Sequence, residues 1–174
     1  ESRRRISTTE VERRIMERLE AEDPSLIDDA IRRGVVEPVD LVTPLQDDWF
    51  YAGVKVSPGH IASGLVLGRN HETEQIINGL EKHACALIAG PSGAGKSALL
   101  WLTANRQSSR WRWLRVKATA TVAEGAAIVR FIRSRHPSPQ SPIALAFDEV
   151  DGANAPLWNV LEKELSSLSS VYLL

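Results

Sequence analysis

Gly90-Pro91-Ser92-Gly93-Ala94-Gly95-Lys96-Ser97 separates an apolar run, Ala84 to Ala89, from a stretch with helical periodicity. The octapeptide fits G-x-x-x-x-G-K-[ST], a loop that wraps phosphate groups when it joins a buried strand to a helix. Glycines let backbone N–H groups approach the phosphates at the helix N-terminus, where they favour negative charge. The stretch therefore predicts a nucleotide-phosphate site.

Each polar residue of this loop has an expected role. Lys96 is placed to reach the β- and γ-phosphates as a point charge, and the Ser97 hydroxyl is placed to bind Mg²⁺. Ala98, the next residue, is expected to border the same phosphates. The alternative is a glycine-rich turn into a helix, which gives no reason for Lys96 and Ser97 to be adjacent. We therefore expect ATP and Mg²⁺ as cofactors.

Two acids follow an apolar strand expected at Ile143 to Phe147. The carboxyl ends of parallel strands meet at one edge of a sheet, so Asp148 and Glu149 are predicted to lie beside the phosphate loop. Asp148 would hold Mg²⁺ opposite Ser97, and Glu149 would orient and polarise the attacking water, which makes Glu149 and Lys96 the candidate catalytic residues. The alternative is that these acids, with Asp151, only cap a helix.

Alternating strands and helices after Leu65 predict an α/β fold with a parallel sheet covered on both faces. The expected elements are a helix from Asn70, a buried strand at 84–89, helices near 95–105, 122–135 and 156–165, and strands at 111–116, 143–147 and near 171. The tryptophans at 101, 111, 113 and 158 are expected to fill the core.

The first part of the chain has a different pattern. Residues 7–34 read as two helices, and residues 35–66 as extended structure with a strand-like Trp49 to Val56 and Pro58-Gly59 as a breaker. We expect a linker segment at 1–64 and an NTPase domain at 65–174. Both ends look cut, so we expect a segment of a longer protein.

Composition bears on the expected partners, compartment and metal content. The formal net charge is −1, so no bulk electrostatic argument favours nucleic acid or a membrane surface as partner. One cysteine, Cys85, and no apolar run of membrane-spanning length predict a cytoplasmic protein. The four histidines show no metal-ligand spacing, so no metal besides Mg²⁺ is expected.

Residues 65–174 resemble the front half of a STAND-type NTPase, a signal-transduction ATPase related to AAA+ proteins. The resemblance lies in Gly68-Arg69 ahead of a helix, in the loop at 90–97 and in LAFDEVD at 145–151. One strand, Trp111 to Val116, intervenes in sequence between the loop and the acids, as in the additional-strand class of P-loop ATPases with a catalytic glutamate. The resemblance implies that Val66, Leu67 and Arg69 border the base.

The same resemblance implies a nucleotide-gated switch that carries effector and sensor domains in the same polypeptide, oligomerises when ATP-bound and often serves in antiphage defence. No sensor-1 residue, arginine finger or lid can be assigned, because in the family these come after the strand at which the sequence stops. Turnover is thus expected to depend on missing parts and on assembly. The alternatives are an AAA+-type remodelling or replication-loader ATPase, and a module that binds nucleotide without significant turnover.

Overall fold

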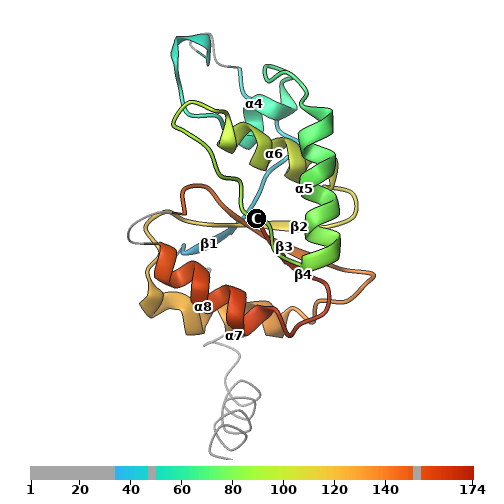
Figure 1. Cartoon of the computed structure of the whole chain (residues 1–174), viewed down its shortest axis with the longest axis vertical. Coiled ribbons are helices and arrows are strands. Elements are labelled where there is room, and N and C mark those ends of the chain that lie inside the picture. Colours follow the sequence, from blue (N-terminus) through green and yellow to red (C-terminus); the bar gives the residue numbers. More distant parts are fainter. Residues whose placement is uncertain (1–33, 47–49, 151–153) are drawn as a thin grey trace, which may run out of the picture.

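The computed structural model describes residues 34–46, 50–150 and 154–174 (Figure 1). The two helices predicted before Gly34, together with Trp49 and Asp151, lie outside the described residues. The elements in chain order are β1 (Val36–Pro38), η1 (Phe50–Ala52), α4 (Pro58–Ala62), α5 (Asn70–His83), α6 (Lys96–Arg106), β2 (Arg112–Val116), η2 (Val122–Glu124), α7 (Gly125–Ser134), β3 (Ile143–Phe147), α8 (Ala155–Leu165) and β4 (Val171–Leu173).

The strands form a mixed sheet in the order β1-β2-β3-β4. β2, β3 and β4 are parallel, with Leu114 paired to Leu145 and Leu145 to Leu173. β1 is antiparallel to β2, with Val36 opposite Val116, and it lies before Leu65, outside the part of the chain for which a parallel sheet was predicted. A short antiparallel strand is common at the edge of such a sheet, and an edge position tolerates Pro38. The predicted α/β class is confirmed.

Helices cover both faces of the sheet, as predicted: α4, α5 and α6 lie on one side, and α7 and α8 on the other (Figure 1). Residues of β3 alternate between the two faces because successive strand side chains point in opposite directions. Ile143, Leu145 and Phe147 pack with the residues of α7 and α8, whereas Ala144 and Ala146 pack with those of α4, α5 and α6. All five residues of β3 are buried, as its continuous apolar sequence predicts.

The small alanines of β3 leave room for large side chains on the α6 side of the sheet. Trp101 of α6 is fully buried there, together with Trp111 and Trp113, and the ring of Trp111 stacks on Tyr172 at 4.2 Å between centroids. On the opposite face Trp158 lies edge-on to Phe147. The prediction that these tryptophans fill the core is confirmed.

Three expected elements differ in the structure. The strand predicted at 49–56 is instead the 3-10 turn η1 followed by irregular backbone, where Gly53 adopts a φ of +101° that a regular strand does not contain. Pro58 begins α4 rather than interrupting the chain, because proline fits the first turn of a helix. The helix expected at 122–135 begins as η2, in which the Glu124 carboxylate accepts a hydrogen bond from Thr121 N.

The run before the phosphate loop is less buried than predicted. Among the residues that the structure describes, 84–89 join the sheet only through a bridge between Cys85 and Leu173 of β4. Ala86 N donates to Leu173 O, and Leu173 N donates to Ala84 O. Leu87 is 64% exposed, so the prediction of a buried strand is wrong. The run lies at the edge of the described sheet, where one side lacks a covering strand within the described residues.

Candidate functional site

Backbone conformation sets the shape of the phosphate loop. Gly93 and Gly95 have φ values of +79° and +78°, which only glycine adopts without strain. Gly90 has no such requirement, since a Cβ there would meet Ala94 Cβ at 3.5 Å, an ordinary contact. α6 then begins at Lys96, so the loop ends at a helix N-terminus as predicted.

The Lys96 side chain folds back over the loop. Its ammonium donates hydrogen bonds to Gly90 O at 3.0 Å and to Pro91 O at 2.9 Å. Pro91, Ser92, Gly93 and Ala94 are exposed, and Ala98 is buried on the first turn of α6. The positive charge is therefore held above an exposed loop, where it can exchange two carbonyl partners for an anion.

Ser97 and Asp148 meet although they come from different elements. Ser97 lies in the first turn of α6, and Asp148 follows Phe147 at the end of β3. Strand alternation turns Asp148 to the face of Ala144 and Ala146, which is the face that α6 covers. Ser97 Oγ donates a hydrogen bond to Asp148 Oδ1 at 2.6 Å. The structure thus joins the phosphate loop to the acid of β3, as the sequence predicts.

Glu149 lies next to this pair in an unusual backbone conformation. Its φ of +84° is in the region that favours glycine, so the residue carries local strain of a kind common at functional sites. Its carbonyl oxygen accepts a hydrogen bond from Asn154 Nδ2 at 3.3 Å. The Glu149 carboxylate is about half exposed, at 55% of its side-chain surface. A water molecule therefore has access to it.

Sequence reasoning missed Lys55, which belongs to the irregular segment between η1 and α4. Lys55 Nζ lies 2.7 Å from Glu149 Oε1 and 3.2 Å from Asp148 Oδ2. The hydrogen bond with Glu149 is the main cause that raises the pKa of Lys55, and the charge of Asp148 adds to it. No periodicity or motif marks Lys55 in the sequence. The only sequence feature that could have pointed to Lys55 is its positive charge in the segment ahead of the phosphate loop.

Arg69, which precedes α5, also contacts the phosphate loop. Its Nη1 donates to Ala94 O at 3.1 Å, while its Nε and Nη2 bind Glu72 at 3.0 and 2.8 Å. Arg69 also lines a hollow of about 390 Å³ between the start of α5 and the end of α6, which Gly68, Asn70, Thr73, Asn105 and Arg106 border as well. Leu67 is 88% exposed nearby in the chain. Whether these residues border a base stays a prediction.

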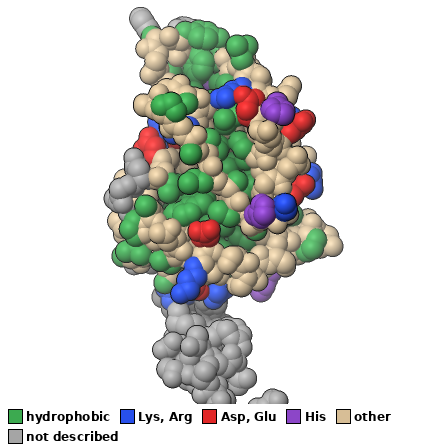
Figure 2. Space-filling view, in the orientation of Figure 1, with side chains coloured by type: hydrophobic (Ala, Val, Ile, Leu, Met, Phe, Trp, Pro, Cys, Tyr) green, Lys and Arg blue, Asp and Glu red, His purple; other side chains and the backbone are tan. Residues whose placement is uncertain are grey.

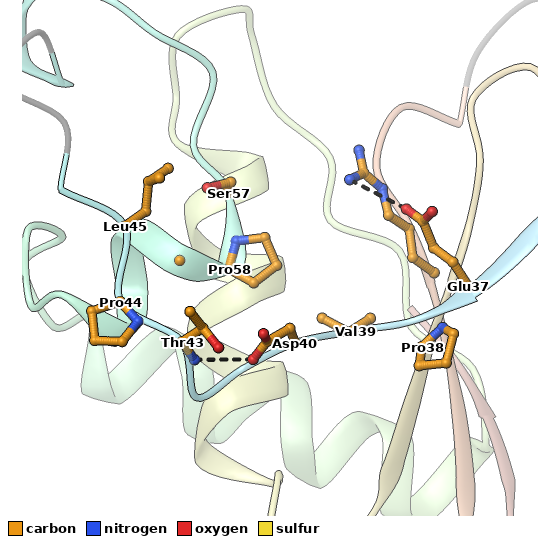
Figure 3. Close-up of a pocket in the computed structure, with 11 residues that line it drawn as sticks. Glu37, Pro38, Val39, Asp40, Thr43, Pro44, Leu45, Ser57 and Pro58 are labelled. Atoms are coloured by element: carbon orange, nitrogen blue, oxygen red, sulfur yellow. Dashed lines mark hydrogen bonds and ion pairs between the residues drawn. The ribbon is translucent and has the colours of Figure 1, made fainter.

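A second hollow lies away from these residues. It measures about 370 Å³ and runs between the end of β1, the loop after it and the start of α4 (Figure 3). Thr43 N donates to Asp40 Oδ1 at its rim, and Glu37 pairs with Arg115. None of the predicted site residues lines it. It is therefore separate from the candidate phosphate site.

The oxygen donors at the site suit Mg²⁺. Within residues 34–46, 50–150 and 154–174 no group of three His, Cys, Asp or Glu residues could hold a metal ion. Mg²⁺ does not need such a group, because it commonly takes one or two protein oxygens and completes its shell with water and phosphate. Ser97 Oγ and Asp148 Oδ1, which lie 2.6 Å apart, are two hard oxygen atoms of this kind.

Cys85 and two arginines near the end of α7 have local structural contacts. Burial, aided by the nearby charge of Glu162, raises the pKa of the Cys85 thiol to about 11. Arg133 of α7 pairs with Glu164 at 3.5 Å, and Arg135, directly after α7, lies over the Phe131 ring. These arginines belong to the layer on the far side of the sheet from α6 (Figure 1). They do not approach the phosphate loop.

Surface charge follows the balanced composition. Acidic and basic side chains are interspersed over the face shown in Figure 2 rather than gathered by sign. No helix within the described part of the chain has both the length and the apolar character that crossing a membrane requires.

Comparison with known proteins gives no relative. No protein-family model, no curated protein and no solved structure matches this chain.

Proposed function

We propose that this chain is a P-loop NTPase module that binds ATP with Mg²⁺. The observation that carries the proposal is the 2.6 Å hydrogen bond from Ser97 Oγ to Asp148 Oδ1, which brings the loop hydroxyl and the strand acid together. In a glycine-rich turn without function, nothing would require the residue after Lys96 to contact an acid from another strand. Two left-handed glycines and the N-terminus of α6 supply the phosphate-facing backbone.

The strand order supports the additional-strand class. The run that leads into the loop bridges to β4, and β4 pairs with β3, so a strand separates the loop run from the acid-bearing strand. A connecting strand, β2, also lies between them in sequence. This arrangement agrees with the STAND-type interpretation, in which the module is a nucleotide-gated switch of a larger cytoplasmic signalling or antiviral-defence protein that assembles into homo-oligomers when active.

Each residue then has a defined task. The Lys96 ammonium exchanges the carbonyls of Gly90 and Pro91 for β- and γ-phosphate oxygens. Ser97 and Asp148 would hold Mg²⁺, which neutralises phosphate charge when bound. The Glu149 carboxylate accepts a proton from the attacking water and orients it.

Turnover depends on more than these groups. The γ-phosphoryl group spreads negative charge over its oxygens during transfer, and related enzymes stabilise that charge with an arginine finger worth roughly 10³ to 10⁵ in rate. Among the described residues, Arg133 of α7 pairs with Glu164, and Arg135, directly after α7, lies over the Phe131 ring, in the layer on the far side of the sheet from α6. We infer that the chain alone binds ATP and hydrolyses it slowly, and that assembly supplies the missing charge.

A titration with a fluorescent ATP analogue in the presence of Mg²⁺ tests the proposal. Lys96→Ala should weaken binding by about tenfold or more, because the phosphate loses a charged hydrogen-bond donor. Lys82→Ala is the matched control, since Lys82 is exposed on α5 and should leave the affinity unchanged. Equal affinities for wild type and Lys96→Ala would reject the loop assignment.

A further inference from the structure

Lys55 is the basic side chain that bridges both acids of the site. Its ammonium forms ion pairs with Asp148 and Glu149 at 3.2 and 2.7 Å. The three side chains differ in exposure: 5% for Asp148, 49% for Lys55 and 55% for Glu149. An ion pair between exposed groups contributes little, but a buried carboxylate depends strongly on its counter-charge. The contact with Asp148 is therefore the important one.

Lys55 is the cation that faces the second carboxylate oxygen of Asp148, Oδ2. Oδ1 accepts the hydrogen bond from Ser97, whereas Oδ2 is buried without a hydrogen-bond partner and faces the Lys55 ammonium. A buried carboxylate without compensation is costly, so a cation beside Oδ2 stabilises the folded site. Lys55 supplies that cation.

The backbone on one side of Lys55 is anchored. Val56, the next residue, packs into the core on the α6 side of the sheet. α4 starts at Pro58, packs against α6 and places His60 in the interior, where Ser57 N donates to its Nδ1 at 3.0 Å. Lys55 thus extends from a segment fixed to α6, the helix whose first turn carries Ser97. Its position beside the acids follows from this packing.

We propose that Lys55 is an internal counter-cation that competes with Mg²⁺ for Asp148 and Glu149 and has to leave these carboxylates when Mg²⁺ and ATP bind. The proposal rests on the proposed function, since it concerns the same acids. Two cations at one pair of carboxylates repel each other, so each weakens the binding of the other. Lys55 thereby raises the Mg²⁺ concentration that nucleotide binding requires, and it couples residues 53–57 to nucleotide occupancy.

A role for Lys55 as a ligand of the nucleotide would reverse the expected effect of its removal on nucleotide binding. If Lys55 instead turned toward the γ-phosphate as a ligand, its removal would weaken nucleotide binding at every Mg²⁺ concentration. A competitor and a ligand can therefore be separated by one titration series.

The experiment measures the Mg²⁺ concentration that gives half-maximal binding of a fluorescent ATP analogue to the chain of 174 residues. Lys55→Met keeps most of the aliphatic stem and removes the charge, Lys55→Arg keeps the charge, and Lys82→Ala is the control. Circular dichroism checks that each variant is folded, and Lys55→Gln replaces Lys55→Met if the latter does not fold.

Competition predicts that Lys55→Met lowers the Mg²⁺ midpoint by about fivefold to tenfold, as loss of one competing ion pair implies. Lys55→Arg and Lys82→Ala should stay within about twofold of wild type. If wild type binds the ATP analogue but the Mg²⁺ midpoint of Lys55→Met is unchanged or higher, the proposed competition by Lys55 is wrong and the proposed function still holds. Absence of binding by wild type would overturn the proposed function, and the inference with it.

Discussion

Ser97 Oγ donates a hydrogen bond to Asp148 Oδ1 at 2.6 Å, although the two residues are 51 positions apart in the chain. Ser97 lies in the first turn of α6 and Asp148 directly follows β3, and the contact fixes the phosphate loop to the carboxyl edge of the sheet. Because Asp148 is nearly buried, this bond also contributes to stability.

Ser97→Ala should lower the free energy of unfolding by about 1 to 2 kcal/mol, since a buried carboxylate oxygen loses its donor. The same substitution in an Asp148→Ala background should cost at most about 0.5 kcal/mol, because the partner is already absent. Urea unfolding of the four proteins measures this coupling. Ser92→Ala, in an exposed part of the loop, is the control and should have little effect. Additive effects of the two substitutions would refute the contact.

The loop glycines should respond unequally to alanine. Gly95→Ala places a Cβ on a residue with a φ of +78° and 3.4 Å from Arg69 Nη1, which should cost about 1 to 2 kcal/mol of stability. Gly90→Ala should cost little, because its Cβ meets an ordinary contact at 3.5 Å. Urea unfolding compares the two variants, and equal losses would contradict the described loop conformation.

Much of this site could be predicted from the sequence, because its chemistry is local. The loop motif specifies its own backbone, and the apolar run before Asp148 specifies a strand whose end carries the acids. The contact between Ser97 and Asp148 then follows from the shared edge of the sheet. The β3 strand was predicted at its observed bounds, 143–147, because it is short, apolar and buried on both faces.

The remaining features depend on long-range packing. Lys55 reaches the acids only because α4 packs on α6, and no local pattern encodes that contact. β1 runs antiparallel at the sheet edge for the same kind of reason, since a three-residue strand has too little sequence to indicate its direction. The apolar sequence of residues 84–89 predicts a buried strand. Their exposure depends instead on which strands lie beside them in the sheet, which the local sequence does not indicate.

Glu149→Gln should leave nucleotide binding intact and reduce turnover, since glutamine keeps the size of the side chain but cannot accept the proton from water. A positioned general base contributes typically 10² to 10⁴ in rate, so a loss of that order is expected. Phosphate release by the assembled, active protein is the measurement, with Lys82→Ala as control. Turnover equal to wild type would remove Glu149 from the mechanism.

The Cys85 thiol should react slowly with iodoacetamide in the folded protein. Its pKa of about 11 leaves about one thiol in a thousand ionised at pH 8, and only the thiolate reacts. The rate should therefore rise about tenfold per pH unit from pH 8 to 10, and unfolding in urea at pH 8 should raise it by about a hundredfold. Mass spectrometry follows the alkylation. Equal rates for folded and unfolded protein would contradict the burial of this thiol.

Calorimetric titration of unlabelled ATP, ADP and AMP, each with Mg²⁺, tests the central claim most directly. In the proposed site the loop backbone would face the α- and β-phosphates and Lys96 the β- and γ-phosphates, so affinity should depend on the phosphate chain rather than on the nucleoside. The account predicts saturable binding of ATP and ADP at one site per chain, with AMP weaker by about a hundredfold or more. AMP binding as tight as that of ATP, or the absence of a saturable signal for any of the three, would contradict it.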